Sequence, residues 1–319
     1  MSEDNNIREK IDLSVLIPLF NERDNLYPLF QKITEVLDGA GFEWEVIFVD
    51  DGSDDGSAKI LSDIKESSSR VKVISLRRNF GKSAALDTGF QDTIGKWVVI
   101  MDADLQDDPE EIPGLIEKLD EGYDLVSGWR VNRQDRFIKK YTSRIYNWVT
   151  SSMSGIKLHD FNCGLKGMVK EVPLSISLYG ELHRYIPVLA YWKGFRVTEK
   201  KVKHHPRAFG ESKFGVYRFF AGFMDMLTVM FLTRYSKKPL HLFGGAGLIL
   251  FIVGLLINGY LVLLSLLDVD FIRVRPLLFL GILLMLIGFQ LISTGLLGEM
   301  MAMSAHRKKG QEVIRKTGR

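Results

Sequence analysis

Two aspartates and a glutamine stand at alternate positions in the segment DADLQ, residues 102–106. They directly follow an apolar run, Trp97 to Met101, that is typical of a buried strand. If the chain leaves that strand extended, the three polar side chains face one point. Two neighbouring carboxylates repel each other unless a cation lies between them, and hard divalent cations prefer oxygen ligands. The segment therefore predicts a site for Mg²⁺ or Mn²⁺ at Asp102, Asp104 and Gln106.

The next two acidic residues, Asp107 and Asp108, have a different interpretation because Pro109 follows them. Aspartates just before a proline are typical of the N-cap and first turn of a helix. We therefore expect both residues to begin a helix rather than to bind a metal ion.

The first half of the chain alternates short apolar runs with helical patterns. The runs are Leu13–Leu19, Glu45–Val49, Val71–Leu76 and Trp97–Met101, and the helical patterns are Leu26–Leu37, Ala58–Glu66 and Ser83–Thr93. This alternation predicts an α/β domain with a mainly parallel sheet covered on both faces. In such sheets ligands bind beyond the carboxyl ends of the strands, and polar clusters follow all four runs.

The cluster DDGSDDGS, residues 50–57, follows the second run. Asp50 and Asp51 could accept hydrogen bonds from a base N–H or from ribose hydroxyls. Asp54 and Asp55 fit a solvated turn before a helix equally well. Arg77, Arg78 and Lys82 follow the third run, and their charges could offset that of a diphosphate.

Two long stretches near the C-terminus lack charged residues: Leu240–Leu267, with His241 as its one ionisable residue, and Pro276–Gly298. About 20 apolar residues span a bilayer core, so both stretches predict membrane spans rather than buried core helices. Glycines in both would permit close helix packing. Basic residues flank the outer ends of the pair, and this bias predicts that both termini lie in the cytoplasm.

Other features narrow the class of protein. The segment Val216–Thr233, rich in aromatic residues and methionine, predicts a helix at the membrane interface, with a core helix as the alternative. The charged N-terminus does not resemble a signal peptide. Cys163 is the single cysteine, which excludes an internal disulfide. A net charge of +3 does not favour a nucleic-acid partner.

The clusters together resemble the family 2 glycosyltransferases through VIPLFNE, VDDGSDDGS, RRNFGKSAAL and MDADLQDDP, in that order. The resemblance continues through SGWRVNRQDR, DFNCGLKGM and HHPRAFGESKF into the two C-terminal spans. This longer pattern is similar to the polyprenyl-phosphate glycosyltransferases, which include dolichyl-phosphate mannose synthase. The resemblance implies a GT-A fold, a Rossmann-like nucleotide-binding α/β domain that uses a divalent ion and inverts the anomeric configuration.

The resemblance also implies roles for individual residues. It implies metal binding by Asp102, Asp104 and Gln106, and a nucleotide-sugar pocket formed by Pro18, Asn21, Glu22, Asp50, Asp51, Lys82 and Asp102. It implies that Arg130, Arg133, Arg207, Ser212 and Lys213 hold the donor diphosphate or the acceptor phosphate, and that Asp160 has a catalytic role. Because a phosphate monoester with a second pKa of about 6 is largely ionised at pH 7, Asp160 could instead orient a sugar hydroxyl or a basic neighbour. Phe214 departs from the family pattern, which often has tyrosine there.

The expected activity is inverting transfer of one hexose, with glucose from UDP-glucose as the first candidate, to polyprenyl (undecaprenyl) phosphate. Mannose from GDP-mannose, galactose and aminoarabinose are the alternative sugars. A processive polysaccharide synthase is a further alternative, although the Q-x-x-R-W motif is missing. A non-catalytic scaffold and a nucleotidyl- or phosphotransferase are the other rivals.

The expected organisation has four parts. A catalytic domain covers residues 1–214, an interface helix 215–236, a transmembrane hairpin 237–300 and a basic tail 301–319. The expected location is a bacterial inner membrane, with the catalytic domain on the cytoplasmic side. The glycine-bearing spans favour a homo-oligomer.

Overall fold

A computed structural model describes residues 11–131, 147, 150–152, 154–205, 239–266 and 275–315 of the chain. These residues belong to two compact units, Met1–Leu227 and Thr228–Arg319. Several residues singled out in the sequence lie outside the described ranges: Arg133, Arg207, Ser212, Lys213 and Phe214. The predicted interface helix, residues 216–233, lies outside them as well.

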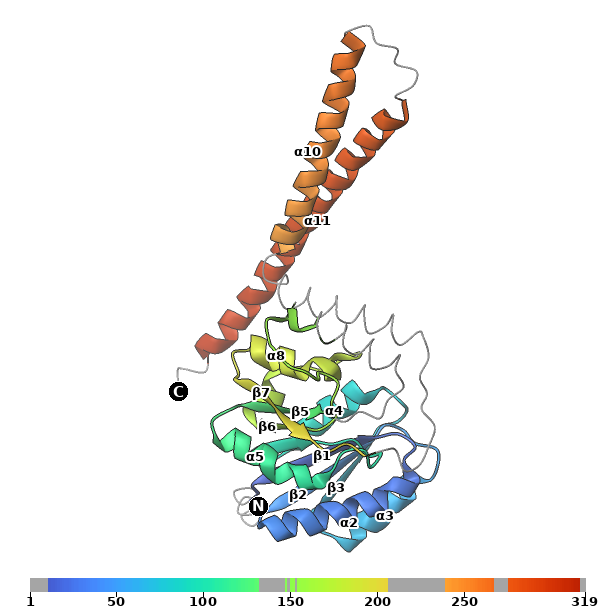
Figure 1. Ribbon diagram of the computed structural model, residues 1–319, viewed down its shortest axis with the longest axis vertical. Helices are drawn as coiled ribbons and strands as arrows, with labels where there is room; N and C mark the ends of the chain where they lie inside the picture. Colours follow the sequence, from blue (N-terminus) through green and yellow to red (C-terminus); the bar gives the residue numbers. More distant parts are fainter. Residues whose placement is uncertain are drawn as a thin grey trace. The chain divides into compact units, whose positions relative to one another are not determined.

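The first unit alternates strands and helices along its first half (Figure 1). Its elements are β1 (Leu13–Leu19), α2 (Arg23–Ala40), β2 (Trp44–Asp50), α3 (Ser57–Ser67), β3 (Val71–Ser75), α4 (Lys82–Phe90), β4 (Trp97–Ile100), η1 (Pro109–Glu111), α5 (Ile112–Asp120), β5 (Leu125–Arg130), β6 (Lys166–Val169), α7 (Glu171–Ser175), η2 (Leu182–Tyr185), α8 (Ile186–Trp192) and β7 (Val197–Val202). The four predicted strands are all present, and each boundary differs from its prediction by at most one residue.

The strands form one seven-stranded sheet in the order β3-β2-β1-β4-β6-β5-β7. The first four strands of this order pair in parallel, and β7 pairs in parallel with β5. Of these seven strands, β6 alone runs in the opposite direction. It lies between β4 and β5 and is antiparallel to both. The prediction of a mainly parallel sheet is therefore confirmed, with one inverted strand that the sequence pattern did not indicate.

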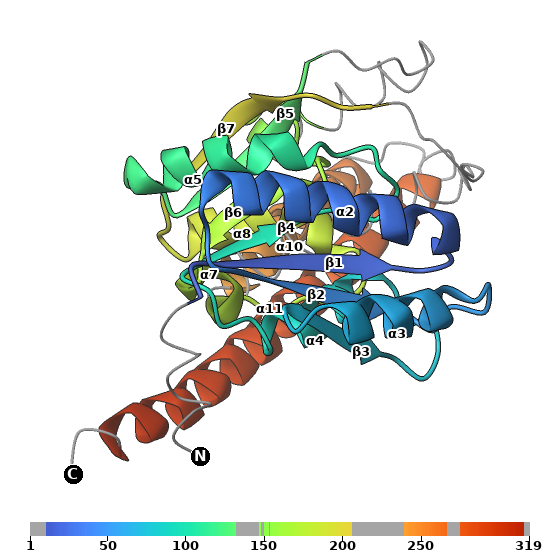
Figure 2. The ribbon, with the colours of Figure 1, turned by 90° about the horizontal axis from the view of Figure 1, so that it is seen from below.

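Helices cover both faces of the sheet. Alternate residues of β1, such as Val15 and Ile17, belong to a buried cluster with the apolar side chains of α2, α3 and α5. On the opposite face, the side chain of Leu16 packs against α4. A Cβ added to Gly89 of α4 would lie 2.3 Å from Cδ1 of Leu16. Figure 2 shows α2 and α5 on one side of β1 and α4 on the other. Because both faces are covered, every residue of β1 and β2 is buried.

The order of the strands locates a crevice. From β1 the chain runs outward through β2 and β3, and it then returns to place β4 on the other side of β1. At such a reversal the connections leave in opposite directions, which opens a crevice beyond the carboxyl ends of the strands. The polar clusters that follow β1, β2 and β4 meet at this edge.

The second unit contains α10 (Pro239–Leu266) and α11 (Arg275–Arg315). By length and composition, Pro239–Leu266 and Pro276–Met301 are both apolar enough to cross a membrane. These ranges agree with the two predicted spans. The helix α11 continues without interruption through the basic segment to Arg315, so its backbone does not end at the predicted boundary after residue 300.

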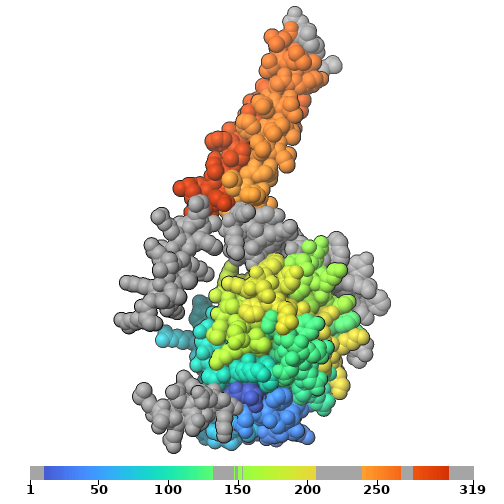
Figure 3. Space-filling view, turned by 90° about the vertical axis from the view of Figure 1, so that its left-hand side faces the viewer, coloured from blue at the N-terminus to red at the C-terminus, as the bar shows by residue number. Residues whose placement is uncertain are grey.

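Glycines allow the two long helices to approach closely. A Cβ at Gly247 would lie 2.5 Å from the carbonyl oxygen of Gly288, and one at Gly254 would lie 2.5 Å from that of Gly281. Figure 3 shows the two helices packed side by side. The predicted glycine packing is confirmed for these four residues. It is wrong for Gly245, which has no atom within 4 Å of an added Cβ.

Candidate functional site

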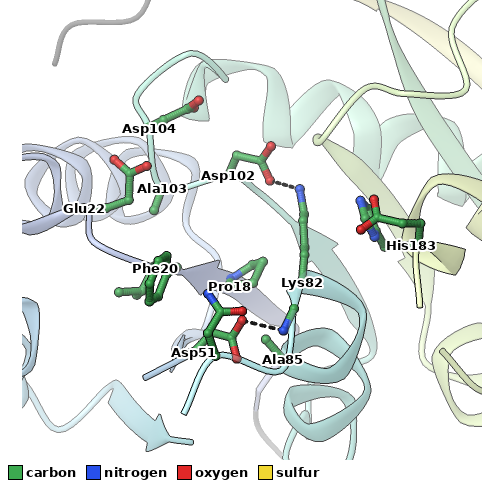
Figure 4. A pocket seen from close by; sticks show the side chains of 14 residues that line it. Pro18, Phe20, Glu22, Asp51, Lys82, Ala85, Asp102, Ala103, Asp104 and His183 are labelled. Carbon is green, nitrogen blue, oxygen red and sulfur yellow. Dashed lines mark hydrogen bonds and ion pairs between the residues drawn. The ribbon is translucent and has the colours of Figure 1, made fainter. Parts of the chain in front are cut away.

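A pocket of about 440 Å³ lies at the carboxyl ends of β1 and β4, with α4 and η2 forming other parts of its wall. Figure 4 shows the charged residues of this wall. Its lining residues are Pro18, Leu19, Phe20, Glu22, Asp51, Asn79, Gly81, Lys82, Ala85, Asp102, Ala103, Asp104, Glu181 and His183. Six of the predicted site residues are among them: Pro18, Glu22, Asp51, Lys82, Asp102 and Asp104.

Asp102 follows β4 and forms an ion pair with Lys82 at the start of α4 (Figure 4). Burial alone would raise the pKa of Asp102. The Lys82 ammonium, assisted by Lys166, outweighs burial and holds that pKa below its ordinary value. Asp102 is therefore ionised at neutral pH, and the pocket contains a carboxylate and an ammonium side by side.

Gly164 supports Asp102 from the loop before β6. A Cβ at this position would lie 2.6 Å from Oδ2 of Asp102 and 2.8 Å from Oδ2 of Asp107. Asp107 in turn accepts a hydrogen bond from the backbone N–H of Asp102 at 3.3 Å. The motif DFNCGLKGM thus contributes a glycine because no larger residue fits behind the two carboxylates.

The chain does not stay extended after Asp102. It turns at Ala103 and Asp104, and Leu105 adopts a left-handed conformation with φ of 59°. Asp104 still lines the pocket, and its Oδ1 accepts the backbone N–H of Gln106 at 3.2 Å. The Gln106 side chain donates to the carbonyl of His205 at 3.3 Å and does not line the pocket. The expectation of an extended segment is therefore wrong, because the chain turns after Asp102 and the Gln106 side chain does not line the pocket with the two aspartates.

The remaining donor set fits a divalent cation. The carboxylates of Asp102, Asp104 and Glu22 border the same cavity in Figure 4. Among the residues that the structure describes, no three His, Cys, Asp or Glu side chains are close enough to form a complete metal cage. Mg²⁺ is commonly held by only one or two carboxylates together with substrate phosphates. Hard oxygen donors that face a cavity without forming a full cage suit that arrangement.

Asp107 and Asp108 have different partners, although both were expected to cap a helix. Asp108 is the N-cap of η1 and accepts the backbone N–H of Glu110 at 3.1 Å, as predicted. Asp107 precedes the cap, and its carboxylate supports the backbone of Asp102 instead. The cap expectation for Asp107 is therefore wrong.

Asp108 also anchors the loop to two neighbouring segments. Its carboxylate contacts Nζ of Lys32 at 2.9 Å and Nε2 of His205 at 2.8 Å. The second contact joins this loop to the segment that follows β7.

The pairing of Asp108 predicts a pH-dependent contribution to stability. Burial would raise the pKa of Asp108, but hydrogen bonds from His205 and Lys32 lower it to about 2. The stabilisation is complete above about pH 4, and it is lost as the pH falls towards the folded-state pKa. We expect Asp108→Asn to lower the free energy of unfolding by about 2 kcal/mol at pH 7 and by clearly less at pH 3. Denaturant titrations at both pH values measure this, and an equal loss at both would contradict it.

Asp50 and Asp51 hold the loops beside the pocket. Oδ1 of Asp50 accepts the backbone N–H of Ser53 at 2.9 Å. Asp51 accepts the backbone N–H groups of Phe80 and Gly81 at 2.7 and 2.8 Å, so it ties the loop after β3 to the end of β2. Asp51 lines the pocket and Asp50 does not.

Gly52 lets these two loops cross closely. A Cβ at Gly52 would lie 2.5 Å from the carbonyl carbon of Arg78, and its φ of 75° also favours glycine. Asp51 and Gly52 together therefore place Lys82 beside Asp102.

Asn21 joins the turns that follow β1 and β2. Its backbone is left-handed, with φ of 57°. Its backbone N–H donates to Oγ of Ser53 at 2.9 Å, and its side chain exchanges hydrogen bonds with Asp54 at 2.8 and 3.0 Å. Asn21 is not among the pocket-lining residues, whereas its neighbours Phe20 and Glu22 are. The geometry therefore gives Asn21 a positioning role.

Arg130 and Asp160 form a buried ion pair outside the pocket lining. Nε and Nη2 of Arg130, at the end of β5, donate to the two carboxylate oxygens of Asp160 at 2.7 and 3.1 Å. The side chains are 12% and 3% exposed. Burial would lower the pKa of Arg130, but the Asp160 carboxylate raises it above its ordinary value. Arg130 is thus a basic neighbour within reach of Asp160.

Two pocket-lining residues, Glu181 and His183, lie outside all the motifs quoted from the sequence. They belong to the segment around η2, which packs against α4. His183 contacts Ser83, and Glu181 pairs with Arg184 at 2.8 Å. No strand end or short motif marks this segment, so no local pattern in the sequence pointed to it.

Comparison with known proteins agrees with this geometry. Residues 14–174 match the family model described as glycosyl transferase family 2. Dodecaprenyl-phosphate galacturonate synthase of Rhizobium johnstonii is 36% identical over 304 residues, which cover 94% of this chain and 90% of that protein. Undecaprenyl-phosphate 4-deoxy-4-formamido-L-arabinose transferase of an Enterobacter species is 35% identical over 289 residues, which cover 90% and 87%.

Solved structures share the fold at lower identity. Glucosyl-3-phosphoglycerate synthase from Mycobacterium tuberculosis, in complex with Mn²⁺, uridine diphosphate and phosphoglyceric acid, has a TM-score of 0.53 and 19% identity, with coverage of 73% of this chain and 81% of that chain. Mannosyl-3-phosphoglycerate synthase from Rubrobacter xylanophilus has a TM-score of 0.55 and 16% identity, with coverage of 71% and 77%. The first unit thus has the GT-A fold. The matched residues and the extent of the similarity show that this chain is a glycosyltransferase and belongs to glycosyl transferase family 2.

Proposed function

We propose that the protein transfers a single hexose from a nucleotide-sugar to a polyprenyl phosphate at the cytoplasmic face of a bacterial inner membrane. Glucose from UDP-glucose is the first candidate donor. The observation that carries the proposal is the pocket in which Asp102, Asp104 and Lys82 gather at the carboxyl ends of the strands. Similarity to polyprenyl-phosphate sugar transferases over nearly the whole chain supports the acceptor class.

Different residues of the pocket would bind the nucleoside and the diphosphate of the donor. The nucleoside would lie towards Pro18, Phe20 and Asp51, and the diphosphate would lie near Lys82. A bound Mg²⁺ or Mn²⁺, held by Asp102 and Asp104, would neutralise charge that develops on the leaving diphosphate. Lys82 would add a fixed positive charge on the same side.

The reaction would be an in-line displacement. An oxygen of the lipid phosphate attacks the anomeric carbon as the bond from that carbon to the diphosphate breaks, and the nucleoside diphosphate leaves with its electrons. The configuration at the anomeric carbon is inverted. Since the attacking phosphate is largely ionised at pH 7, no residue needs to remove a proton from it. Asp160 would hold Arg130 in position to bind a phosphate group. Arg133, Arg207, Ser212 and Lys213 would bind the phosphate groups together with Arg130.

The remaining parts of the chain would bring this chemistry to the lipid. We propose that residues 1–214 form the cytoplasmic catalytic domain, 215–236 a helix at the membrane interface, and 237–300 a transmembrane hairpin. A basic cytoplasmic tail, 301–319, would follow. Both termini would face the cytoplasm, and a homo-oligomer through the spans is part of the proposal.

A donor panel tests this function. Purified full-length protein in detergent is incubated with undecaprenyl phosphate, Mg²⁺ or Mn²⁺, and one labelled donor at a time. The panel contains UDP-glucose, UDP-galactose, UDP-galacturonate, GDP-mannose and a UDP-linked aminoarabinose derivative. We expect one sugar per lipid, with UDP-glucose the best donor. A lipid carrying a growing chain would favour a processive synthase, and no labelled lipid with any donor would refute the proposal.

A further inference from the structure

His183 occupies the end of the pocket away from the proposed nucleoside site. In Figure 4, Lys82 and Asp102 lie between His183 on one side and Phe20 and Glu22 on the other. If the nucleoside lies near Phe20 and the diphosphate near Lys82, the sugar extends towards His183. Glu181, two residues before His183 in the same segment, also lines the pocket. This step rests on the proposed function.

The contacts of Ser83 determine which nitrogen of His183 carries the proton. Ser83, in α4, is 1% exposed, and its Oγ accepts the backbone N–H of His183 at 3.1 Å. The same oxygen lies 3.0 Å from Nδ1 of the His183 ring. A hydroxyl group has one hydrogen to donate, and within the part of the chain that the structure describes Nδ1 is the acceptor that Ser83 Oγ contacts. Nδ1 is therefore assigned as an acceptor, which leaves the ring proton on Nε2.

The charges around the ring keep it neutral. Burial lowers the pKa of His183 well below its ordinary value, and the nearby cations Lys82, Arg184 and Lys166 lower it further, against the opposite effect of Asp102. A second proton on Nδ1 would also remove the acceptor of the Ser83 hydroxyl. This end of the pocket thus offers a neutral N–H donor from His183 and a carboxylate acceptor from Glu181, whose other contact is Arg184 at 2.8 Å.

We propose that His183, held in one tautomer by Ser83, donates its Nε2–H to a hydroxyl of the donor sugar, while Glu181 accepts from a neighbouring hydroxyl. A neutral hexose satisfies both groups, because each hydroxyl can donate one hydrogen and accept others. A uronic acid would place a second carboxylate beside Glu181. The subsite therefore selects a neutral sugar, and His183 and Glu181 are residues that determine sugar specificity.

Two substitutions of His183 distinguish the roles of its two ring nitrogens. The amide nitrogen of His183→Gln can reach the position of Nε2, whereas that of His183→Asn lies near Nδ1. The experiment measures the dissociation constants of UDP-glucose and of UDP for the full-length protein. If the panel shows another preferred donor, that donor and its nucleoside diphosphate are used instead. His183→Gln is expected to stay within about twofold of wild type for both ligands. His183→Asn is expected to bind the sugar nucleotide about 3- to 10-fold more weakly, the range of one lost neutral hydrogen bond, with UDP unchanged.

Other outcomes overturn the assignment. Equal weakening of UDP and UDP-glucose in His183→Asn would mean that His183 supports the diphosphate site or the fold. Unchanged binding of both ligands would mean that it does not touch the sugar. If His183→Asn does not fold, Ser83→Ala gives the same comparison, since it leaves the ring in place without its fixed tautomer and should weaken only the sugar nucleotide.

A pair of donors that differ only at carbon 6 tests the sugar class. Wild-type protein is expected to prefer UDP-galactose to UDP-galacturonate, and Glu181→Gln should reduce that preference. A wild-type preference for UDP-galacturonate would overturn the assignment of a neutral sugar. Failure of the proposed function looks different, because the wild-type protein would then transfer no sugar from any donor in the panel.

Discussion

Replacement of Asp104 with alanine is expected to lower kcat by at least about a thousandfold, because the pocket loses one of two carboxylates suited to holding a divalent cation. Asp104 also accepts the backbone N–H of Gln106, so the alanine variant changes the turn as well as the charge. Asp104→Asn keeps an oxygen acceptor for that N–H while it removes the charge. Both variants should therefore lose activity to a similar extent.

Steady-state rates of sugar transfer at saturating donor measure this effect. Asp63→Ala is the matched control, because Asp63 is an exposed residue of α3 that does not line the pocket. The control should retain wild-type kcat. Activity of Asp104→Asn within about tenfold of wild type would contradict the proposed metal role of this carboxylate.

The second large effect is expected at Asp160. Asp160→Ala removes the carboxylate that receives two hydrogen bonds from the buried Arg130 guanidinium. Leaving one member of a buried ion pair without its partner typically costs about 3–5 kcal/mol. The free energy of unfolding of the first unit, followed by tryptophan fluorescence, should fall by that amount. Glu121→Ala, which breaks an exposed pair with Lys118, should change it by less than about 1 kcal/mol.

Rates distinguish a positioning role of Asp160 from a general-base role. If Asp160 acts only by holding Arg130, then Asp160→Ala should lower kcat in the wild-type background but add almost nothing when Arg130 is already methionine. The double variant should also recover part of the lost stability, since neither charge is then buried alone. A general base would continue to lower kcat by a large factor in the Arg130→Met background, and that result would contradict the positioning role.

The local part of this site could be predicted from sequence because it depends on short apolar runs. Leu13–Leu19 and Trp97–Ile100 are strands whose ends are visible as a change from apolar to polar residues. In a parallel sheet those ends share one edge, so residues such as Glu22 and Asp102 could be expected to meet. Asp102 and Asp104 were placed correctly at that edge on this basis, although the turn at Leu105 was not foreseen.

The other parts depend on contacts between distant segments. The antiparallel strand β6 has only four residues, and it pairs with β4 across more than 60 positions of sequence. His183 reaches the pocket because Ser83, 100 positions earlier, binds its ring and backbone. The ion pair between Arg130 and Asp160 also joins two segments with no shared pattern. No local periodicity carries information about such pairings, and the structure was needed to find them.

The nucleotide released in the transfer reaction tests the central claim most directly. Full-length protein, undecaprenyl phosphate, a divalent cation and the preferred donor are incubated together, and the nucleotide product is separated by ion-exchange chromatography. One nucleoside diphosphate should be released for each sugar that enters the lipid fraction, because the lipid phosphate displaces the diphosphate at the anomeric carbon. Release of a nucleoside monophosphate would mean transfer of a sugar 1-phosphate, and it would contradict the proposed reaction.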